Sequence, residues 1–153
     1  MRRTLVVGLA FMVAALGITV GVATATPGER TIVPEQIGAG TIAGQVRIRQ
    51  EVGESTQVFR MTFGPGSSTG WHSHPGKTVV IVQSGEFTLY RASDPTCTGT
   101  TYEAGQGFVE PRISVHIGRN EGSTDAVLAV VYFRVPPGGS PRIDQPDPGT
   151  CNF

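Results

Sequence analysis

The sequence predicts an all-β protein: one domain of short strands, closed as a barrel or sandwich, behind an N-terminal export signal. The chain has 153 residues, which fits a single domain. It is rich in glycine (21) and proline (11), so tight turns are expected at short intervals. Beyond the first 25 residues no segment keeps the apolar period of about 3.6 residues that marks an amphipathic helix.

Residues 1–25 have the pattern of a secretory signal peptide. Arg2 and Arg3 give a positive start, residues 5–23 are almost entirely apolar, and Ala-Thr-Ala at 23–25 offers the small residues that signal peptidase needs. We expect cleavage after Ala25 and a secreted or extracytoplasmic protein without membrane attachment. The alternative is an uncleaved anchor, because the apolar run is long enough to span a bilayer. The two arginines leave both the Sec and the Tat export route open.

Short strands are expected from residue 41 to residue 135, after an extended arm at residues 26–40. Seven segments have strand-like alternation or β-branched content: residues 41–48, 57–63, 77–83, 86–90, 107–109, 114–117 and 126–135. Turn residues rich in glycine and proline separate them. The turn at Gln83-Ser84-Gly85 has the length of a hairpin connection. These segments are sufficient for one barrel domain at 41–135.

Residues 136–153 form a Pro/Gly-rich tail in which no strand pattern is evident. The chain has two cysteines, Cys97 in the strand region and Cys151 in this tail. In an oxidising compartment such a pair most simply forms a disulfide, which would pin the tail to the domain. Two free thiols are the alternative.

The charge distribution argues against a nucleic-acid partner. Lys and Arg together number 12 and are balanced by 12 Asp and Glu, and the arginines are scattered. A basic patch or stripe, the usual mark of a nucleic-acid surface, is therefore not evident. No residue pattern identifies a protein partner face, and a homodimer is left open.

The three histidines of the chain, His72, His74 and His116, are its strongest functional signal. On a strand, residues two apart face the same side about 7 Å apart, so His72 and His74 can reach one metal ion. His116 lies in another strand-like segment. Imidazole suits Fe, Cu, Ni or Zn, and three protein ligands leave positions open for water or substrate. The alternative is a set of histidines that binds no metal.

The residues around these histidines resemble the two sequence motifs of the cupin family. The spacing of the first motif is matched by Gly66, His72, His74 and Gly85. The spacing of the second motif is matched by Gly105, Pro111, His116 and Asn120. The resemblance implies a jelly-roll β-barrel that holds one divalent transition metal ion (Fe, Zn, Ni, Cu or Mn) through His72, His74 and His116.

Two positions depart from the family pattern: Thr78 stands in place of a glutamate and Ile113 in place of a glycine. Without the glutamate the ligand set is neutral, so we expect the ion to attract a small anionic or deprotonated molecule. Thr78 itself is a candidate for a weak or water-mediated contact. Glu86 and Glu110 are candidates for a substitute ligand, but each lies beside a turn, and we interpret both as solvent or rim residues.

Two functions follow from this reading. The first is an exported metal-binding cupin with a mononuclear three-histidine site that acts as a metal-dependent oxidoreductase, dioxygenase-like on a small molecule. The second is a non-catalytic module that binds a metal ion or a small ligand. A purely structural metal is a third reading. Beyond the metal ligands the sequence identifies no catalytic residue.

Overall fold

The computed structural model describes residues 35–153, and within that range it contains ten β-strands and no helix. The signal peptide predicted at residues 1–25 and the first part of the predicted arm lie outside the described residues. Between residues 35 and 153 there is no helix long and apolar enough to cross a membrane. The predicted all-β class is confirmed for the described part of the chain.

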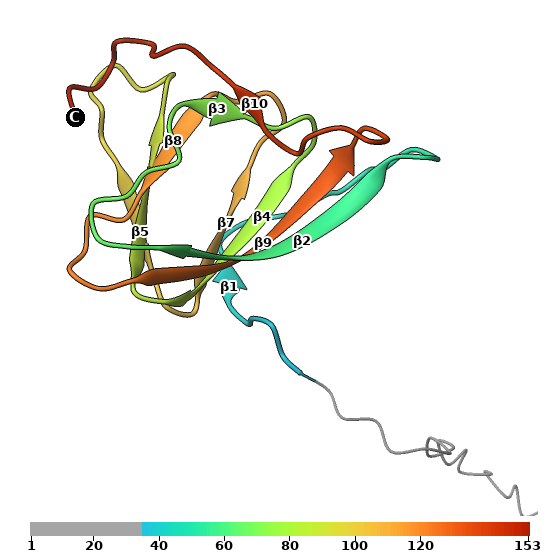
Figure 1. The fold of residues 1–153 in the computed structure, drawn as a ribbon, viewed down its shortest axis with the longest axis horizontal. Coiled ribbons are helices and arrows are strands. Elements are labelled where there is room, and N and C mark those ends of the chain that lie inside the picture. The colour runs from blue at the N-terminus through green and yellow to red at the C-terminus, as the bar shows by residue number, and fades with distance from the viewer. Residues whose placement is uncertain (1–34) are drawn as a thin grey trace, which may run out of the picture. The chain divides into compact units, whose positions relative to one another are not determined.

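The strands form two five-stranded sheets that lie on opposite sides of the domain (Figure 1). In spatial order the first sheet contains β1 (Thr41–Ile42), β7 (Gln106–Glu110), β4 (Thr78–Ser84), β9 (Ala126–Val135) and β2 (Ser55–Phe63). The second contains β10 (Ile143–Asp144), β3 (His72–Ser73), β8 (His116–Arg119), β5 (Glu86–Arg91) and β6 (Thr100–Glu103). Only the β1–β7 pair is parallel among these strands.

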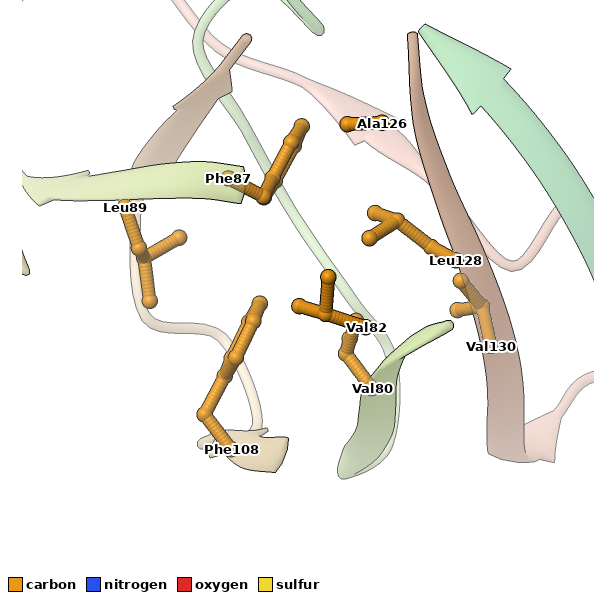
Figure 2. Close-up of a cluster of buried hydrophobic side chains, with 8 residues drawn as sticks. All are labelled: Val80, Val82, Phe87, Leu89, Phe108, Ala126, Leu128 and Val130. Carbon is orange, nitrogen blue, oxygen red and sulfur yellow. The ribbon is translucent and has the colours of Figure 1, made fainter. Parts of the chain in front are cut away.

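One apolar core fills the space between the sheets. It is formed by Val80, Val82, Phe87, Leu89, Phe108, Ala126, Leu128 and Val130 (Figure 2). On β4, β7 and β9 the core residues are the even-numbered ones, because side chains alternate between the two faces of a strand. The next position on the same face of each strand is occupied by a polar residue that also faces inward: Thr78 on β4, Glu110 on β7 and Tyr132 on β9. Thr78 is paired in register with both Glu110 and Tyr132, so these polar residues lie side by side at one end of the core.

One predicted strand segment is shorter in the structure, and strand β6 is present where none was predicted. The segment at 41–48 is a strand only over β1, because Gly44 takes a φ of 108°, which breaks the extended conformation. Strand β6 was not predicted, because its sequence, Thr-Thr-Tyr-Glu, has no apolar alternation. Its Tyr102 nevertheless stacks on Phe108 of the core, with ring centroids 4.3 Å apart.

The C-terminal tail contains a short strand that the sequence did not indicate. Strand β10 pairs antiparallel with β3, with Asp144 opposite His72. The backbone N–H of Gln145 also donates to the carbonyl of Trp71, at 3.0 Å. Two residues are too few to show alternation, so this pairing depends on tertiary contacts. The tail therefore lies directly against the strand that carries His72.

The predicted disulfide between Cys97 and Cys151 is present. Cys151 is buried and packs with Trp71 and Ile117 in a second apolar cluster. The bond ties the end of the tail to the loop after β5 and so holds the tail beside β3.

Removing this disulfide should lower the free energy of unfolding by about 4 kcal/mol, because the bond closes a loop with a sequence separation of 54 residues. The measurement is urea unfolding of the Cys97→Ser/Cys151→Ser variant, followed by the fluorescence of Trp71, the single tryptophan. Wild-type protein with and without reductant is the control. An unchanged free energy of unfolding would contradict the prediction.

Asn120, a residue of the second motif, serves the fold. Its side chain is fully buried, and its amide nitrogen donates to the carbonyls of Phe63 (2.7 Å) and Thr124 (2.8 Å). Its amide oxygen accepts from the backbone N–H of Gly122 at 3.0 Å. These bonds join the end of β2 to the loop between β8 and β9.

Replacing Asn120 by Ala should lower the free energy of unfolding by about 2–4 kcal/mol, because buried backbone groups lose their partners. Chemical unfolding measures this change. Asn152→Ala, at an exposed asparagine, is the matched control and should shift the value by less than about 0.5 kcal/mol. Equal effects of the two substitutions would exclude a structural role for the Asn120 bonds.

Candidate metal centre

His72, His74 and His116 meet at the end of the barrel where β3 and β8 pair. His72 lies on β3, directly opposite His116 on β8, and His74 follows β3. All three residues are buried, at 5%, 2% and 2% exposure. Their ring centroids are 4.4–5.1 Å apart, and one ligand atom from each lies within 4.8 Å of the others. The predicted convergence of the three imidazoles is confirmed.

Each imidazole is oriented by a backbone carbonyl. The Nδ1 atoms of His72, His74 and His116 lie 2.9, 2.7 and 2.8 Å from the carbonyl oxygens of Gly70, Pro141 and Ser114, in that order. A carbonyl can only accept, so each Nδ1 carries the hydrogen. In a neutral ring the lone pair is then on Nε2. The tail takes part in this arrangement, because Pro141 supplies the acceptor for His74.

The Nε2 atoms of His74 and His116 are buried and have no hydrogen-bond partner within residues 35–153. A buried polar atom left unpaired is costly, by about 1–3 kcal/mol each. A metal ion bound between the two Nε2 atoms would serve as the partner of both, since neutral imidazole nitrogen is a common metal ligand. The side chains present therefore fit a bound transition metal ion.

Glu110 lies inside this cluster, and the interpretation of Glu110 as a solvent or rim residue is wrong. Its residue exposure is only 6%, and its two carboxylate oxygens lie 3.0 Å from His74 Nε2 and 3.2 Å from His116 Nε2. The reason is the alternation on β7, where Phe108 faces the core and Glu110 follows it on the same face. The side chains around the candidate metal position are therefore not a neutral set.

Burial and neighbouring charges shift three pKa values in the site. Burial, with a contribution from the nearby His116, lowers the pKa of His72 to about 4, so this ring is neutral at pH 7. Burial alone would raise the pKa of Glu110, but His116 and His74, when they are protonated, outweigh it and lower that pKa to about 2. Burial, aided by the charge of Glu110, raises the pKa of Tyr132 to about 12, so the phenol keeps its proton.

The other two candidates differ in position. Thr78 is fully buried beside Glu110, and its hydroxyl has no hydrogen-bond partner among the described residues. Glu86 is not brought to the histidines: it begins β5 and lines a separate hollow with Gly85 and Gly122. Ile113, where the family pattern has glycine, is half exposed and takes a φ of 59°, a conformation that disfavours β-branched residues.

The site opens on a pocket of about 70 Å³, room for about five water molecules. Six apolar side chains line it: Met61, Phe63, Val80, Phe87, Leu128 and Val130. The other lining residues are Thr69, His72, His74, Glu110, Tyr132 and Arg142. The pocket therefore has apolar walls with a few polar groups at the histidine end, which is typical of a small-molecule site.

Sequence reasoning missed two of these polar residues, Tyr132 and Arg142. Tyr132 lies in a long apolar run, but its alternation with Leu128 and Val130 would have placed it inside. The Tyr132 hydroxyl contacts the Met61 sulfur at 3.7 Å, and its ring centroid lies 5.1 Å from that of His74. Arg142 lies in the tail, where nothing in the sequence relates it to the histidines.

The fold is a jelly-roll barrel, and its interior holds three histidines close enough together to bind one metal ion. The family model for the cupin domain matches residues 59–133. This range contains all three histidines and Glu110. The chain belongs to the cupin superfamily.

Comparison with solved structures gives the following similarities. An uncharacterized conserved protein with a double-stranded β-helix domain, from Klebsiella pneumoniae, is 20% identical, with a TM-score of 0.47 over 67% of this chain and 83% of that one. A cupin-like protein from Thermotoga maritima is 28% identical, with a TM-score of 0.44 over 52% and 56%.

An oxalate oxidase is 27% identical, with a TM-score of 0.44 over 52% of this chain. The match spans only 41% of the length of the oxalate oxidase chain. A comparison with curated proteins found no match.

Proposed function

We propose that this protein is an exported metal-binding cupin in which His72, His74 and His116 hold one divalent transition metal ion. The observation that carries the proposal is the common orientation of the three buried rings. Every Nδ1 is engaged by a backbone carbonyl, so every neutral ring has its Nε2 lone pair free for the ion. Imidazole with a nearby carboxylate suits Fe²⁺, Zn²⁺, Ni²⁺, Cu²⁺ or Mn²⁺. The disulfide supports a location outside the cytoplasm.

We further propose that the pocket binds a small anionic molecule at the ion. Three histidines leave coordination positions open. The ion and Arg142 together carry more positive charge than the negative charge of Glu110. The Arg142 guanidinium lines the pocket and is held by its Nε, which donates to Asp144 at 2.6 Å. A guanidinium suits a carboxylate group because it can donate two parallel hydrogen bonds. The pocket volume favours a ligand of only a few heavy atoms.

When bound, such an ion polarises a coordinated oxygen as a Lewis acid, and iron adds reactivity toward O₂. The residues of the chain orient the ligand: Arg142 holds its anionic group, and the apolar walls exclude water. Tyr132 adds a polar group that suits both an oxidoreductase, dioxygenase-like on a small molecule, and a non-catalytic binding module. Its protonated phenol lines the pocket beside His74, where it can donate a hydrogen bond to a ligand oxygen.

The double substitution His72→Ala/His116→Ala should reduce the metal content from about one ion per chain to nearly none, because a single imidazole remains. Elemental analysis of the purified protein measures the content, and circular dichroism checks that the strands persist. Wild-type protein after chelation and reloading is the control. Full metal content in the folded variant would contradict the three-histidine assignment.

Replacing Arg142 by Gln should weaken the binding of a small carboxylate such as glycolate about 10- to 100-fold, because a hydrogen bond to a charged group is lost. The measurement is a titration of the Co²⁺-loaded protein followed by its visible absorption. Arg60→Gln, at an exposed arginine on β2, is the matched control. Equal affinities of the two variants for glycolate would argue against an anion site at Arg142.

A further inference from the structure

Thr78 and Glu110 are direct neighbours across the β4–β7 pair. The position that lacks the family's carboxylate is therefore next to a position that has one. Thr78 stands where the family pattern has a glutamate, and Glu110 is its partner in register on β7. Both residues are buried and face inward with the core. Side chains paired in this way have Cβ atoms about 5 Å apart. A carboxylate moved from β4 to β7 at this level therefore stays at the same end of the barrel.

The contacts of Glu110 have the spacing of ligands on one ion. Its two oxygens reach two different rings, at 3.0 Å from His74 Nε2 and 3.2 Å from His116 Nε2. Neighbouring ligands of one ion at bond lengths of about 2.1 Å are about 3.0–3.4 Å apart. These short contacts do not serve as hydrogen bonds, because both Nε2 atoms have no hydrogen-bond partner within residues 35–153. The oxygens thus lie off the direction in which a hydrogen on Nε2 would point.

A carboxylate buried next to unprotonated nitrogen lone pairs is unfavourable unless a cation lies between them. The Thr78 hydroxyl is too short to replace the missing glutamate, and it has no hydrogen-bond partner in the described part of the chain. The longer side chain of Glu110, from β7, reaches the histidines instead.

We propose that Glu110 is the fourth protein ligand of the metal ion and supplies from β7 the carboxylate that is absent from β4. This inference rests on the proposed three-histidine site. It makes the ligand set anionic, so a divalent ion keeps one net positive charge. An oxygen ligand also shifts the preference of the site toward harder ions such as Fe²⁺ and Mn²⁺.

Replacing Glu110 by Gln tests the proposal. The affinity for Co²⁺ and Zn²⁺, measured by titration calorimetry, should fall about 100-fold or more. Mutation of a group that only orients a metal ligand already lowers metal affinity about 10- to 100-fold, and a direct ligand should contribute at least as much. The visible absorption of bound Co²⁺ should also change. Glu86→Gln, at a carboxylate that lines a different hollow, is the matched control and should leave both measurements unchanged.

The exchange variant Thr78→Glu/Glu110→Thr returns the carboxylate to β4. It should recover most of the affinity that Glu110→Thr alone loses, because the two positions lie at the same level of the sheet. No recovery in a folded exchange variant would argue that the Glu110 position itself is structural and would overturn the proposed relocation.

A crystal structure of wild-type protein loaded with Co²⁺ decides the question even if these variants fail to fold. A Glu110 oxygen within about 2.2 Å of the ion supports the proposal, and a distance beyond about 3 Å overturns it. Wild-type affinity and spectrum in folded Glu110→Gln would overturn the role of Glu110 but leave the three-histidine site intact. If wild-type protein bound neither Co²⁺ nor Zn²⁺, the histidine site and the Glu110 proposal would both be overturned.

Discussion

The arrangement of the site depends on one repeated interaction, a hydrogen bond from an imidazole Nδ1 to a backbone carbonyl. It occurs at all three histidines, with acceptors before β3, before β8 and in the C-terminal tail. Because these acceptors are fixed by the backbone, each ring has one orientation and one neutral tautomer. The inward Nε2 atoms of His74 and His116 accordingly have no hydrogen-bond partner among residues 35–153. If one of these carbonyls moved out of hydrogen-bond distance, its ring could rotate although the ligand residue itself was unchanged.

The two sheets contribute different chemistry to this arrangement. The second sheet carries imidazole, from β3 and β8, while the first carries oxygen, from Thr78, Glu110 and Tyr132 on three adjacent strands. The apolar core fills the barrel up to the level of these polar residues. The polar groups thus lie in a low-dielectric setting, in which electrostatic interactions are stronger than in water.

The sequence was sufficient to predict the fold class, the convergence of the three histidines and the disulfide. Each has a simple signal in the sequence: turn residues, the spacing of the histidines, or the presence of two cysteines. The sequence was misleading for Glu110. The proximity of Pro111 suggested a rim, although the alternation with Phe108 already placed that side chain inside. Thr78 stood out only as a missing glutamate, because its pairing with β7 is a matter of register. Such cross-strand neighbours are visible only once strand pairing is known.

Arg142 and the carbonyl of Pro141 belong to a segment with no sequence signal, and it is held by β10 and the Cys97–Cys151 bond. This staple persists only under oxidising conditions. In a reducing cytoplasm, Pro141 and Arg142 would therefore be held beside the histidines by the β10–β3 pairing without the disulfide. In an exported chain, as proposed above, this second link between tail and domain would form only after the chain leaves the cytoplasm.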